Sequence, residues 1–220
     1  MATPNHRQEN QRVYILHTYP FKETSLIAEV FTEKFGRIPV VAKGARRPRS
    51  SIRGMLQSFQ ILLANWSGKS ELKSLNGLEW CEKLTILEGD ELMCGFYINE
   101  LMMRLLPRDE PHIDLFHFYH ETILALSEGR ELTITLRRFE LKLLQALGYA
   151  VTLDQDEDSN PIIPDKIYRY EAEYGACDLT KTDRGIKVLG KTLLDMANDQ
   201  YLDKETQQQS KQLMRYLLGF

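Results

Sequence analysis

The sequence predicts an α+β protein, with a small β-barrel at its N-terminal end and an α-helical domain after it. Residues 11–78 alternate between apolar and polar side chains in short runs that end at turn residues. From about residue 85 the apolar residues recur at helical spacing instead. This helical period is lost over residues 150–187, which predicts a small irregular or β insertion. The expected domains are residues 1–80 and residues 81–220.

Five short runs form the expected barrel strands. They are RVYILHTYP, TSLIAEVFTE, RIPVVAK, FQILLANWSG and SELKSLNGL. In the second run, Leu26, Ala28 and Val30 share one face of the strand. So many short strands in fewer than eighty residues favour a closed barrel over an open sheet, because closure leaves no unpaired edge.

Three strongly periodic helices are expected after the barrel. The first, within GDELMCGFYINELMMRLLP, has Asp90 as its predicted N-cap and ends at Pro107. It is apolar on nearly all sides, which predicts a place at the centre of the helical core. The second ends near Gly129 and the third at Gly148. IYRYEAEYGAC then predicts a hairpin, and VLGKTLLDMAND and DKETQQQSKQLMRYLLGF predict two closing helices.

Residues 34–53 carry the most pronounced functional signal, because this stretch is basic and contains no acidic residue. Its seven cations are Lys34, Arg37, Lys43, Arg46, Arg47, Arg49 and Arg53. Apolar side chains occupy alternate positions directly before the last five of these cations, which predicts a strand leading into a basic loop. Lys69 and Lys73 extend the patch from the last predicted hairpin. Such a surface suits a polyanion, most commonly a nucleic acid; the alternative is a solvated loop without a ligand.

The distribution of charge supports two modules with different partners. The whole chain has a net charge of −3. Residues 1–82 contain twelve Lys and Arg against seven Asp and Glu, whereas the remainder contains sixteen against twenty-four. An acidic surface repels a polyanion, so nucleic acid is expected to meet mainly the first module.

Two further groups of residues are candidates for binding. Small barrels bind single strands by adding aromatic platforms to a basic groove. The candidate platforms are Tyr14, Tyr19, Phe21, Phe59 and Trp66, of which most are expected in the core and one or two on the surface. In the third helix, Arg137 and Arg138 beside Phe139 could receive an acidic, hydrophobic peptide. The alternative there is an arginine paired with Glu140 or with a nearby helix.

The sequence contains none of the common motifs of nucleotide-binding, metal-binding or nucleophilic catalytic sites. There is no G-x-x-x-x-G-K-[ST], no G-x-G-x-x-G, no C-x-x-C and no nucleophile elbow. His117 and His120 lie at i, i+3, where packing is the commoner role than metal binding. Asp154, Asp156 and Asp158 resemble the start of a calcium loop, but a serine replaces the turn glycine and two prolines interrupt it. The chain is therefore expected to be no enzyme and to hold no metal or cofactor.

The expected location is the cytoplasm. The three cysteines, Cys81, Cys94 and Cys177, are far apart and odd in number, which argues for a reducing compartment. The N-terminus lacks the apolar segment of a secretory signal. No apolar run approaches the length that crosses a bilayer, so no membrane partner is expected.

The sequence contains the motifs Y-x-x-x-E-T-S-L, V-A-K-G-A-R and Y-I-N-E-L, in this order. In their residues and their spacing, these motifs resemble the bacterial RecO family of DNA repair proteins. The helix LRRFELKLLQALGY also resembles the family, and the resemblance covers roughly residues 11–218. It implies an N-terminal OB-fold barrel and an α-helical C-terminal domain.

The resemblance also implies a function. RecO proteins are recombination mediators that bind single- and double-stranded DNA and anneal complementary strands. With RecR, and in many bacteria RecF, they load RecA onto DNA coated by single-strand binding protein, which places them at the nucleoid. Their helical domain binds the acidic tail of the coat protein, which strengthens the expectation for Arg137, Arg138 and Phe139. Some members carry a four-cysteine zinc site after the third helix; this chain lacks those cysteines, so zinc is not expected.

Two other functions are also compatible with the sequence. OB-folds also bind RNA, so an RNA-binding or translation-related protein is one alternative. An adaptor whose basic loop binds an acidic protein is the other.

Overall fold

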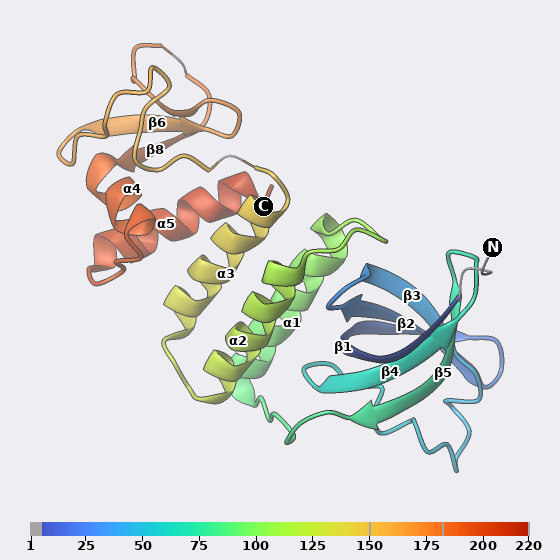
Figure 1. Ribbon diagram of the computed structural model, residues 1–220. Helices are drawn as coiled ribbons and strands as arrows, with labels where there is room; N and C mark the ends of the chain where they lie inside the picture. The colour runs from blue at the N-terminus through green and yellow to red at the C-terminus, as the bar shows by residue number, and fades with distance from the viewer. Residues whose placement is uncertain (1–5, 150, 182, 220) are drawn as a thin grey trace. The chain divides into compact units, whose positions relative to one another are not determined.

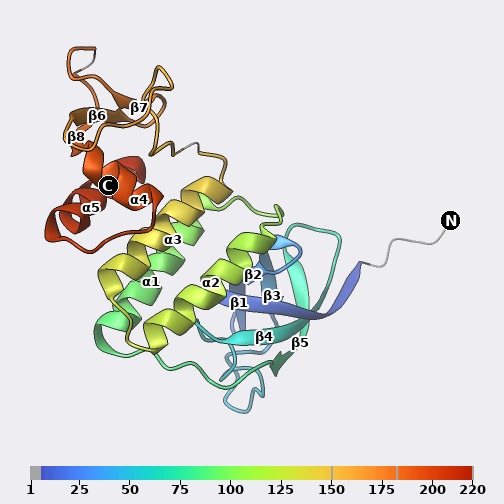
Figure 2. The ribbon, with the colours of Figure 1, turned by 60° about the vertical axis from the view of Figure 1, so that its left-hand side comes forward.

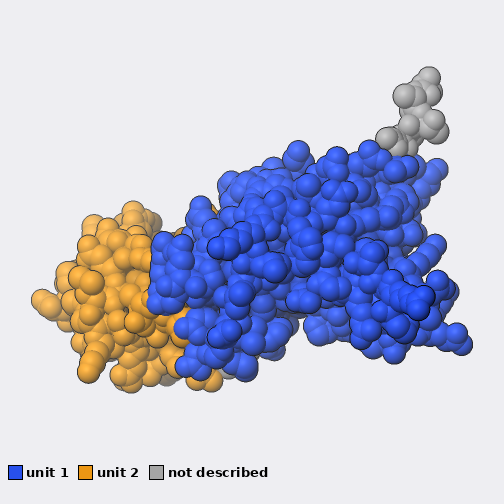
Figure 3. Space-filling view, turned by 90° about the horizontal axis from the view of Figure 1, so that it is seen from below, with its two compact units in different colours: residues 1–130 blue, residues 131–220 orange. Residues whose placement is uncertain are grey.

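The computed structural model describes residues 6–149, 151–181 and 183–219 (Figure 1). The chain forms two compact units, divided between Arg130 and Glu131 (Figure 3). Among these described residues, the first unit contains a β-barrel and two helices, and the second contains three helices and a small sheet. This confirms the predicted α+β class, with a barrel first and helices after it.

The barrel has five strands. They are β1 (Arg7–Phe21), β2 (Ser25–Thr32), β3 (Gly36–Ala42), β4 (Ile61–Ser67) and β5 (Lys73–Trp80). The strand order β1-β2-β3-β5-β4 closes on itself. All neighbours are antiparallel except β3 and β5, which are parallel at Val40 and Lys73. This is the arrangement of an OB-fold barrel.

The barrel encloses the core of the first unit. Ala28 and Val30 point into it together with Val13, Ile38 and Trp66, as the alternation of the second strand predicts. Each buried large apolar side chain contributes about 1.5–3 kcal/mol, so the interior supplies most of the stability of the barrel.

Helices α1 (Gly89–Leu105) and α2 (Ile113–Ser127) cover part of the outer surface of the barrel. They lie side by side in Figure 1 and Figure 2. Tyr14 of β1 packs on Phe116 and Tyr119 of α2, at ring-centroid distances of 5.7 and 4.8 Å. Burial raises the pKa of both tyrosines. These contacts place α1 and α2 in the same compact unit as the barrel.

The first helix differs from its prediction in two ways. It begins at Gly89, after Glu88 and without a side-chain cap, so the prediction that Asp90 is its N-cap is wrong. Asp90 lies within the first turn, where its negative charge interacts favourably with the helix dipole. The helix is also not buried on all sides, because Met93 is 66% and Phe96 50% exposed.

The second unit combines α3 (Leu132–Ala146), α4 (Gly190–Ala197) and α5 (Lys204–Leu217) with a three-stranded sheet. The sheet contains β6 (Ile167–Glu171), β7 (Gly175–Cys177) and β8 (Ile186–Leu189) in the order β7-β6-β8. The antiparallel pairing of β6 with β7 confirms the predicted hairpin. Gly148, with a φ of +82°, ends α3 as predicted. Val188, expected in a helix, instead belongs to β8.

None of the helices within the described part of the chain combines the length and the apolar character needed to cross a membrane.

Candidate nucleic-acid interface

The basic loop (residues 43–55) follows β3 and is a series of hydrogen-bonded turns. The N–H groups of Arg47 and Ser50 donate to the carbonyls of Gly44 and Arg47, at 3.0 and 3.1 Å. The loop is also tied to the turn between β1 and β2, because the Arg46 N–H donates to the Thr24 carbonyl at 2.8 Å. Ala45 is fully buried in the barrel core. The loop therefore has a defined backbone with its cations directed outward.

Five predicted DNA-binding residues lie in this loop, and all five are exposed: Lys43, Arg46, Arg47, Arg49 and Arg53. Within residues 6–149, 151–181 and 183–219, none of them takes part in an ion pair. Like charges held close together without counter-charges repel one another. This repulsion raises the free energy of the folded loop, and a bound anion would relieve it. The loop is thus the part of the surface best suited to a polyanion.

A groove of about 520 Å³ lies beside the loop. Its lining comes from three segments: Phe21, Lys22, Thr24 and Ser25; then Val41, Lys43, Gly44 and Arg47; and finally Leu72, Lys73 and Ser74. No Asp or Glu is among these residues. The turn between β1 and β2 and the loop between β4 and β5 thus meet at the groove, and OB-folds bind oligonucleotides through these two loops.

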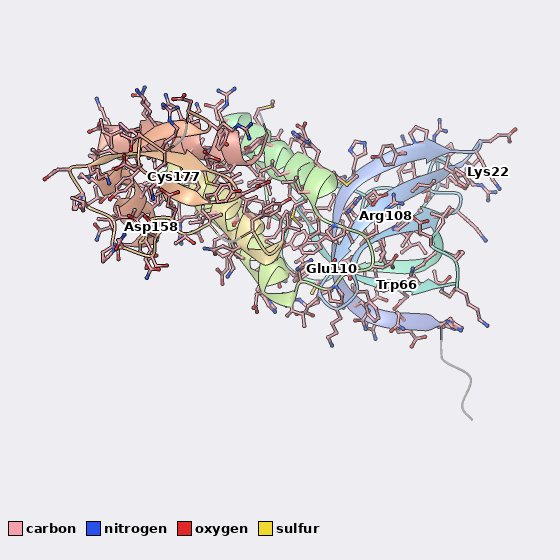
Figure 4. All side chains as sticks on the ribbon, turned by 90° about the horizontal axis from the view of Figure 1, so that it is seen from above. Lys22, Trp66, Arg108, Glu110, Asp158 and Cys177 are labelled. Carbon is pink, nitrogen blue, oxygen red and sulfur yellow. The ribbon has the colours of Figure 1, made fainter. Side chains whose placement is uncertain are left out.

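Lys22 is a groove residue that the sequence analysis did not predict. It is exposed, it adopts a positive φ of +52°, and its Nζ lies 5.3 Å from the centroid of the Phe21 ring. Figure 4 shows Lys22 at the end of the barrel that is remote from Arg108 and Glu110. A cation in the turn between the first two predicted strands could have indicated a binding residue. Lys22 was not predicted because it lies outside the acid-free stretch of residues 34–53.

The absence of a side chain at Gly44 lets the Arg47 side chain lie against the groove. Gly44 has a φ of +68°, a conformation that favours glycine. A Cβ atom at this position would lie 3.5 Å from both Cδ and Nε of Arg47, so the arginine side chain passes over the glycine backbone. The V-A-K-G-A-R motif therefore combines a turn glycine with the cations on either side of it.

The other predicted cations lie outside the basic loop. Lys34 and Arg37 lie at the opposite end of β3 from Lys43, which is about 23 Å for seven strand residues. Lys69 is exposed in the loop between β4 and β5. Lys73 lines the groove, but its Nζ pairs with Asp109 at 3.2 Å.

Arg37 has its charge engaged inside the first unit. Its Nη1 lies 3.0 Å from Oε2 of Glu29, and its Nε donates to the Leu106 carbonyl at 3.0 Å. Arg108 also pairs with Glu29, and this hydrogen bond is the main reason that the pKa of Arg108 is raised. Arg37 thus connects the barrel with the segment that follows α1.

The five aromatic candidates divide into core and surface, as expected. Tyr14, Phe59 and Trp66 are 2%, 5% and 2% exposed, so they are not available as platforms. Tyr19 is 43% exposed, and Phe21 is half-buried at the groove.

The candidate peptide site in α3 contains only one exposed residue. Arg137 is buried and pairs with Glu140 at 2.7 Å, which is the alternative that the sequence left open, and Phe139 is fully buried. Arg138 is exposed, and its Nε donates to Oδ1 of Asp199 at 2.7 Å. This hydrogen bond raises the pKa of Arg138.

The other candidate ligands have structural contacts. His120 Nδ1 lies 2.6 Å from the Tyr14 hydroxyl, and His117 Nε2 lies 3.4 Å from Glu33 Oε1. Asp156 Oδ1 accepts hydrogen bonds from the N–H groups of Asp158 and Asn160, at 3.0 and 2.9 Å, which closes a turn. In the part of the chain that the structure describes, no three His, Cys, Asp or Glu side chains are grouped so that they could hold a metal ion.

Comparison with known proteins places the chain in a family. The family model described as recombination protein O N terminal matches residues 6–84, and the one described as recombination protein O C terminal matches residues 87–218. A DNA repair protein RecO of Nitrosospira multiformis is 50% identical over 100% of this chain and 92% of the relative. The DNA repair protein RecO of Dechloromonas aromatica is 45% identical over 96% of this chain and 89% of its own length. That of Aromatoleum aromaticum is 46% identical over 97% and 90%.

The two family models together cover nearly the whole of both compact units, and the motifs Y-x-x-x-E-T-S-L and V-A-K-G-A-R contribute residues to the groove and the basic loop. The chain belongs to the RecO family, the recombination protein O family of DNA repair proteins.

Proposed function

We propose that this protein is a recombination mediator of DNA repair that acts in the cytoplasm at the nucleoid. It binds single- and double-stranded DNA and anneals complementary strands. With RecR, it helps to load RecA onto DNA coated by single-strand binding protein, and RecF takes part where it is present. The observation that carries the proposal is the acid-free groove at the OB-fold loops, where Lys22, Lys43 and Arg47 have no ion-pair partner among the described residues.

The arrangement of charge explains how such a mediator works without bond chemistry. The cations of the groove and the basic loop neutralise phosphates and release counterions, which gives affinity without sequence preference. A strand held by its backbone keeps its bases able to pair with an incoming strand. Annealing and loading need no nucleophile and no ATP, so the protein acts as no enzyme.

A titration of affinity against salt tests the proposed contact. If about five phosphates are neutralised, the logarithm of the single-strand affinity falls with the logarithm of salt concentration with a slope of about −3.5. Replacing Arg46, Arg47 and Arg49 together with Ala removes three of these contacts and reduces the slope by about 2.

The matched control replaces Lys204, Lys211 and Arg215 of α5, which are also exposed, and thus changes the net charge equally. The control is expected to retain the wild-type slope. Unchanged affinity and slope in a folded basic-loop variant would place the DNA site elsewhere.

The proposed contact with the tail of the coat protein depends on Arg138. Because Arg137 and Phe139 are buried, only Arg138 presents a charge, and a carboxylate of the tail would compete with Asp199 for it. Arg138→Glu is expected to abolish binding of an acidic, phenylalanine-ended peptide and to leave binding of naked DNA unchanged. Lys211→Glu serves as the control of equal charge change. Retention of peptide binding in Arg138→Glu would give Arg138 a purely structural role.

Two experiments separate the proposal from its alternatives. Competition between DNA and RNA strands of equal length distinguishes a DNA mediator from an RNA-binding protein. Nuclease treatment before a pull-down distinguishes DNA-bridged partners from an acidic protein that binds the loop directly. Annealing of DNA coated by the cognate single-strand binding protein, without ATP, tests the mediator activity itself.

A further inference from the structure

A β-bulge interrupts β1 where the strand leaves the region covered by α1 and α2. Ile15 pairs with Val30 of β2, but the next paired residue is His17, opposite Glu29, so Leu16 has no partner on β2. A bulge of one residue reverses the alternation of the strand beyond it. Ile15 before the bulge and Thr18 after it therefore both face inward, since Thr18 pairs with the core residue Ala28.

The bulge consequently determines where three aromatic rings lie. Beyond it, His17, Tyr19 and Phe21 occupy alternate positions on the outer face of β1. Without the extra residue, the same three side chains would point into the barrel, where the alternation places core residues. We define these three residues as the aromatic stripe.

The bulge is held by a buried amide. Nδ2 of Asn99, in α1, donates to the Leu16 carbonyl at 2.9 Å, and Oδ1 of Asn99 accepts from the Tyr119 hydroxyl at 2.6 Å. Ser58 Oγ donates to the same Leu16 carbonyl at 3.4 Å. Asn99 is 3% exposed, so an unused amide group there would be costly. The amide thus satisfies the carbonyl that the bulge removes from the β ladder.

The aromatic stripe runs directly into the groove. His17 and Tyr19 are exposed, and their ring centroids lie 4.5 Å apart in an edge-on arrangement. Phe21 lines the groove and is followed by Lys22. From His17 to Phe21 the strand advances about 14 Å, which corresponds to about four nucleotides of a stacked strand. This length is within the range of site sizes that single OB-folds use.

A second hollow of about 290 Å³ adjoins the stripe at its other end. Its lining includes Leu16, Tyr19, Phe96 and Met103, and Glu100 is the one acidic residue among the described residues that line it. The exposed side chains of Phe96 on α1 and Tyr19 on the barrel thus line the same hollow. The apolar hollow suits a flat ring, whereas the carboxylate of Glu100 disfavours a phosphate.

We propose that the aromatic stripe stacks the bases of a single strand whose phosphates lie in the groove. This inference rests on the proposed function and extends it to a set of residues that recognise unpaired bases. The ligand must carry both rings and regular negative charge, because the stripe is aromatic at one end and meets acid-free cations at the other. Paired bases are stacked inside a duplex and cannot lie on such a surface, so the stripe acts on single strands alone.

The test uses three DNA ligands of equal length: a single-stranded oligothymidine, an oligomer of the same phosphate and sugar backbone without bases, and a duplex. Affinities are measured by fluorescence anisotropy at fixed salt concentration. The wild-type protein is expected to bind oligothymidine more tightly than the abasic strand. Each stacked ring contributes about 5- to 150-fold.

Replacing His17 and Tyr19, the two stripe residues that do not line the groove, with Ala is expected to remove this preference and leave binding of the abasic strand and the duplex unchanged. Tyr19→Phe retains the ring and is expected to retain the preference. Tyr174→Ala, which removes an exposed tyrosine from the second unit, is the matched control and is expected to behave as the wild type.

The result that overturns the inference is an unaltered preference for oligothymidine in the double variant. The proposed function is judged separately, because the basic-loop variant at Arg46, Arg47 and Arg49 is expected to lose affinity for all three ligands. If the stripe variant is unaffected while the loop variant loses binding, the groove contact stands and the stripe is structural.

Discussion

Arg37 and Glu29 form an ion pair across the outer surface of the barrel, with Nη1 of the arginine 3.0 Å from Oε2 of the glutamate. The side chain of Glu29 is only 2% exposed, so the pair is largely removed from water. Arg37 therefore differs from the exposed arginines of the basic loop, although both belong to the same acid-free stretch of sequence.

Arg37→Ala is expected to reduce the free energy of unfolding by about 3 kcal/mol, because it leaves a buried carboxylate with one arginine fewer. The value lies at the low end for buried pairs because Arg108 still contacts Glu29. Arg49→Ala, the matched control, is expected to change stability by less than about 0.5 kcal/mol. Urea denaturation of both variants checks this. Equal midpoints would show that the pair contributes nothing to folding.

Gly36→Ala is expected to destabilise the first unit severely. Gly36 has a φ of +69°, and an added Cβ would lie 2.1 Å from the carbonyl oxygen of Glu110, a backbone atom that cannot turn aside. Gly129 has nearly the same φ, +68°, but nothing lies within 4 Å of its missing Cβ. Gly129→Ala is therefore expected to cost only the conformational strain of about 1–2 kcal/mol. A thermal melt of the two variants measures the difference; similar losses would argue against close contact at Gly36.

Asn99→Ala is expected to weaken single-strand binding although Asn99 is buried and cannot touch DNA. Loss of its amide leaves the Leu16 carbonyl and the Tyr119 hydroxyl with fewer partners, which costs about 1–3 kcal/mol of stability. The Leu16 carbonyl at the bulge then keeps only the longer hydrogen bond from Ser58, so the outward direction of the aromatic stripe is held less firmly. The ratio of affinities for oligothymidine and the abasic strand is the readout.

Tyr119→Phe is the companion variant. It removes one hydrogen bond to Asn99 but leaves the bond between Asn99 and Leu16 in place. It is expected to lose stability yet keep the preference for bases. If both variants keep that preference, Asn99 stabilises the fold without positioning the stripe.

Acid is expected to weaken the second unit through Asp203, the N-cap of α5. The hydrogen bond from Lys191, followed by that from the Thr206 N–H, holds the pKa of Asp203 well below its usual range. The folded state therefore keeps this carboxylate charged while the unfolded chain binds a proton. The contribution is present above the unfolded pKa of about 3.9 and is lost as pH falls below it.

Asp203→Asn separates the charge from the cap, since asparagine is an equally good N-cap. Its stability, followed by urea denaturation between pH 6 and pH 2 at roughly unit intervals, is expected to fall less steeply with acid than that of the wild type. Asp165→Asn, at an exposed position, is the control and is expected to follow the wild-type profile. Superimposable profiles for all three proteins would exclude a role for the Asp203 charge.

Treatment with a metal chelator is expected to leave the stability of the small sheet unchanged. Its neighbouring loop is closed by the turn at Asp156 and by Lys181, which pairs with Glu157 and Asp158 at 3.1 and 2.6 Å. Asp156→Ala is therefore expected to lower the melting temperature, whereas a chelator is not. A chelator-induced fall in the melting temperature of the wild type would contradict this account.

Much of the fold follows from local sequence pattern. The period-two runs predicted the strands of the barrel, and the 3.6-residue period of Leu132, Leu136 and Phe139 predicted α3 with its end at Gly148. These features depend on neighbours within a few residues, so periodicity reports them directly. The basic loop could also be predicted, because its five cations lie within eleven residues of sequence and no acidic residue lies among them.

Tertiary structure decided which of the predicted residues are buried, which form ion pairs and which line the groove. Arg37 and Arg47 are alike in sequence, but β2 places Glu29 beside the first, while the turn at Gly44 directs the second to the groove. Arg137 and Arg138 are adjacent, yet one is buried against Glu140 and the other is exposed.

The chain by itself thus determined the classes of structure and the place of the positive charge, because both are set by composition and short-range period. It did not determine Lys22 as a groove residue or the outward direction of Tyr19. Those depend on strand pairing and on a bulge held by Asn99, 83 residues from Leu16 in the sequence. Contacts over such separations form only when the barrel closes and α1 packs on it, so no local pattern could have reported them.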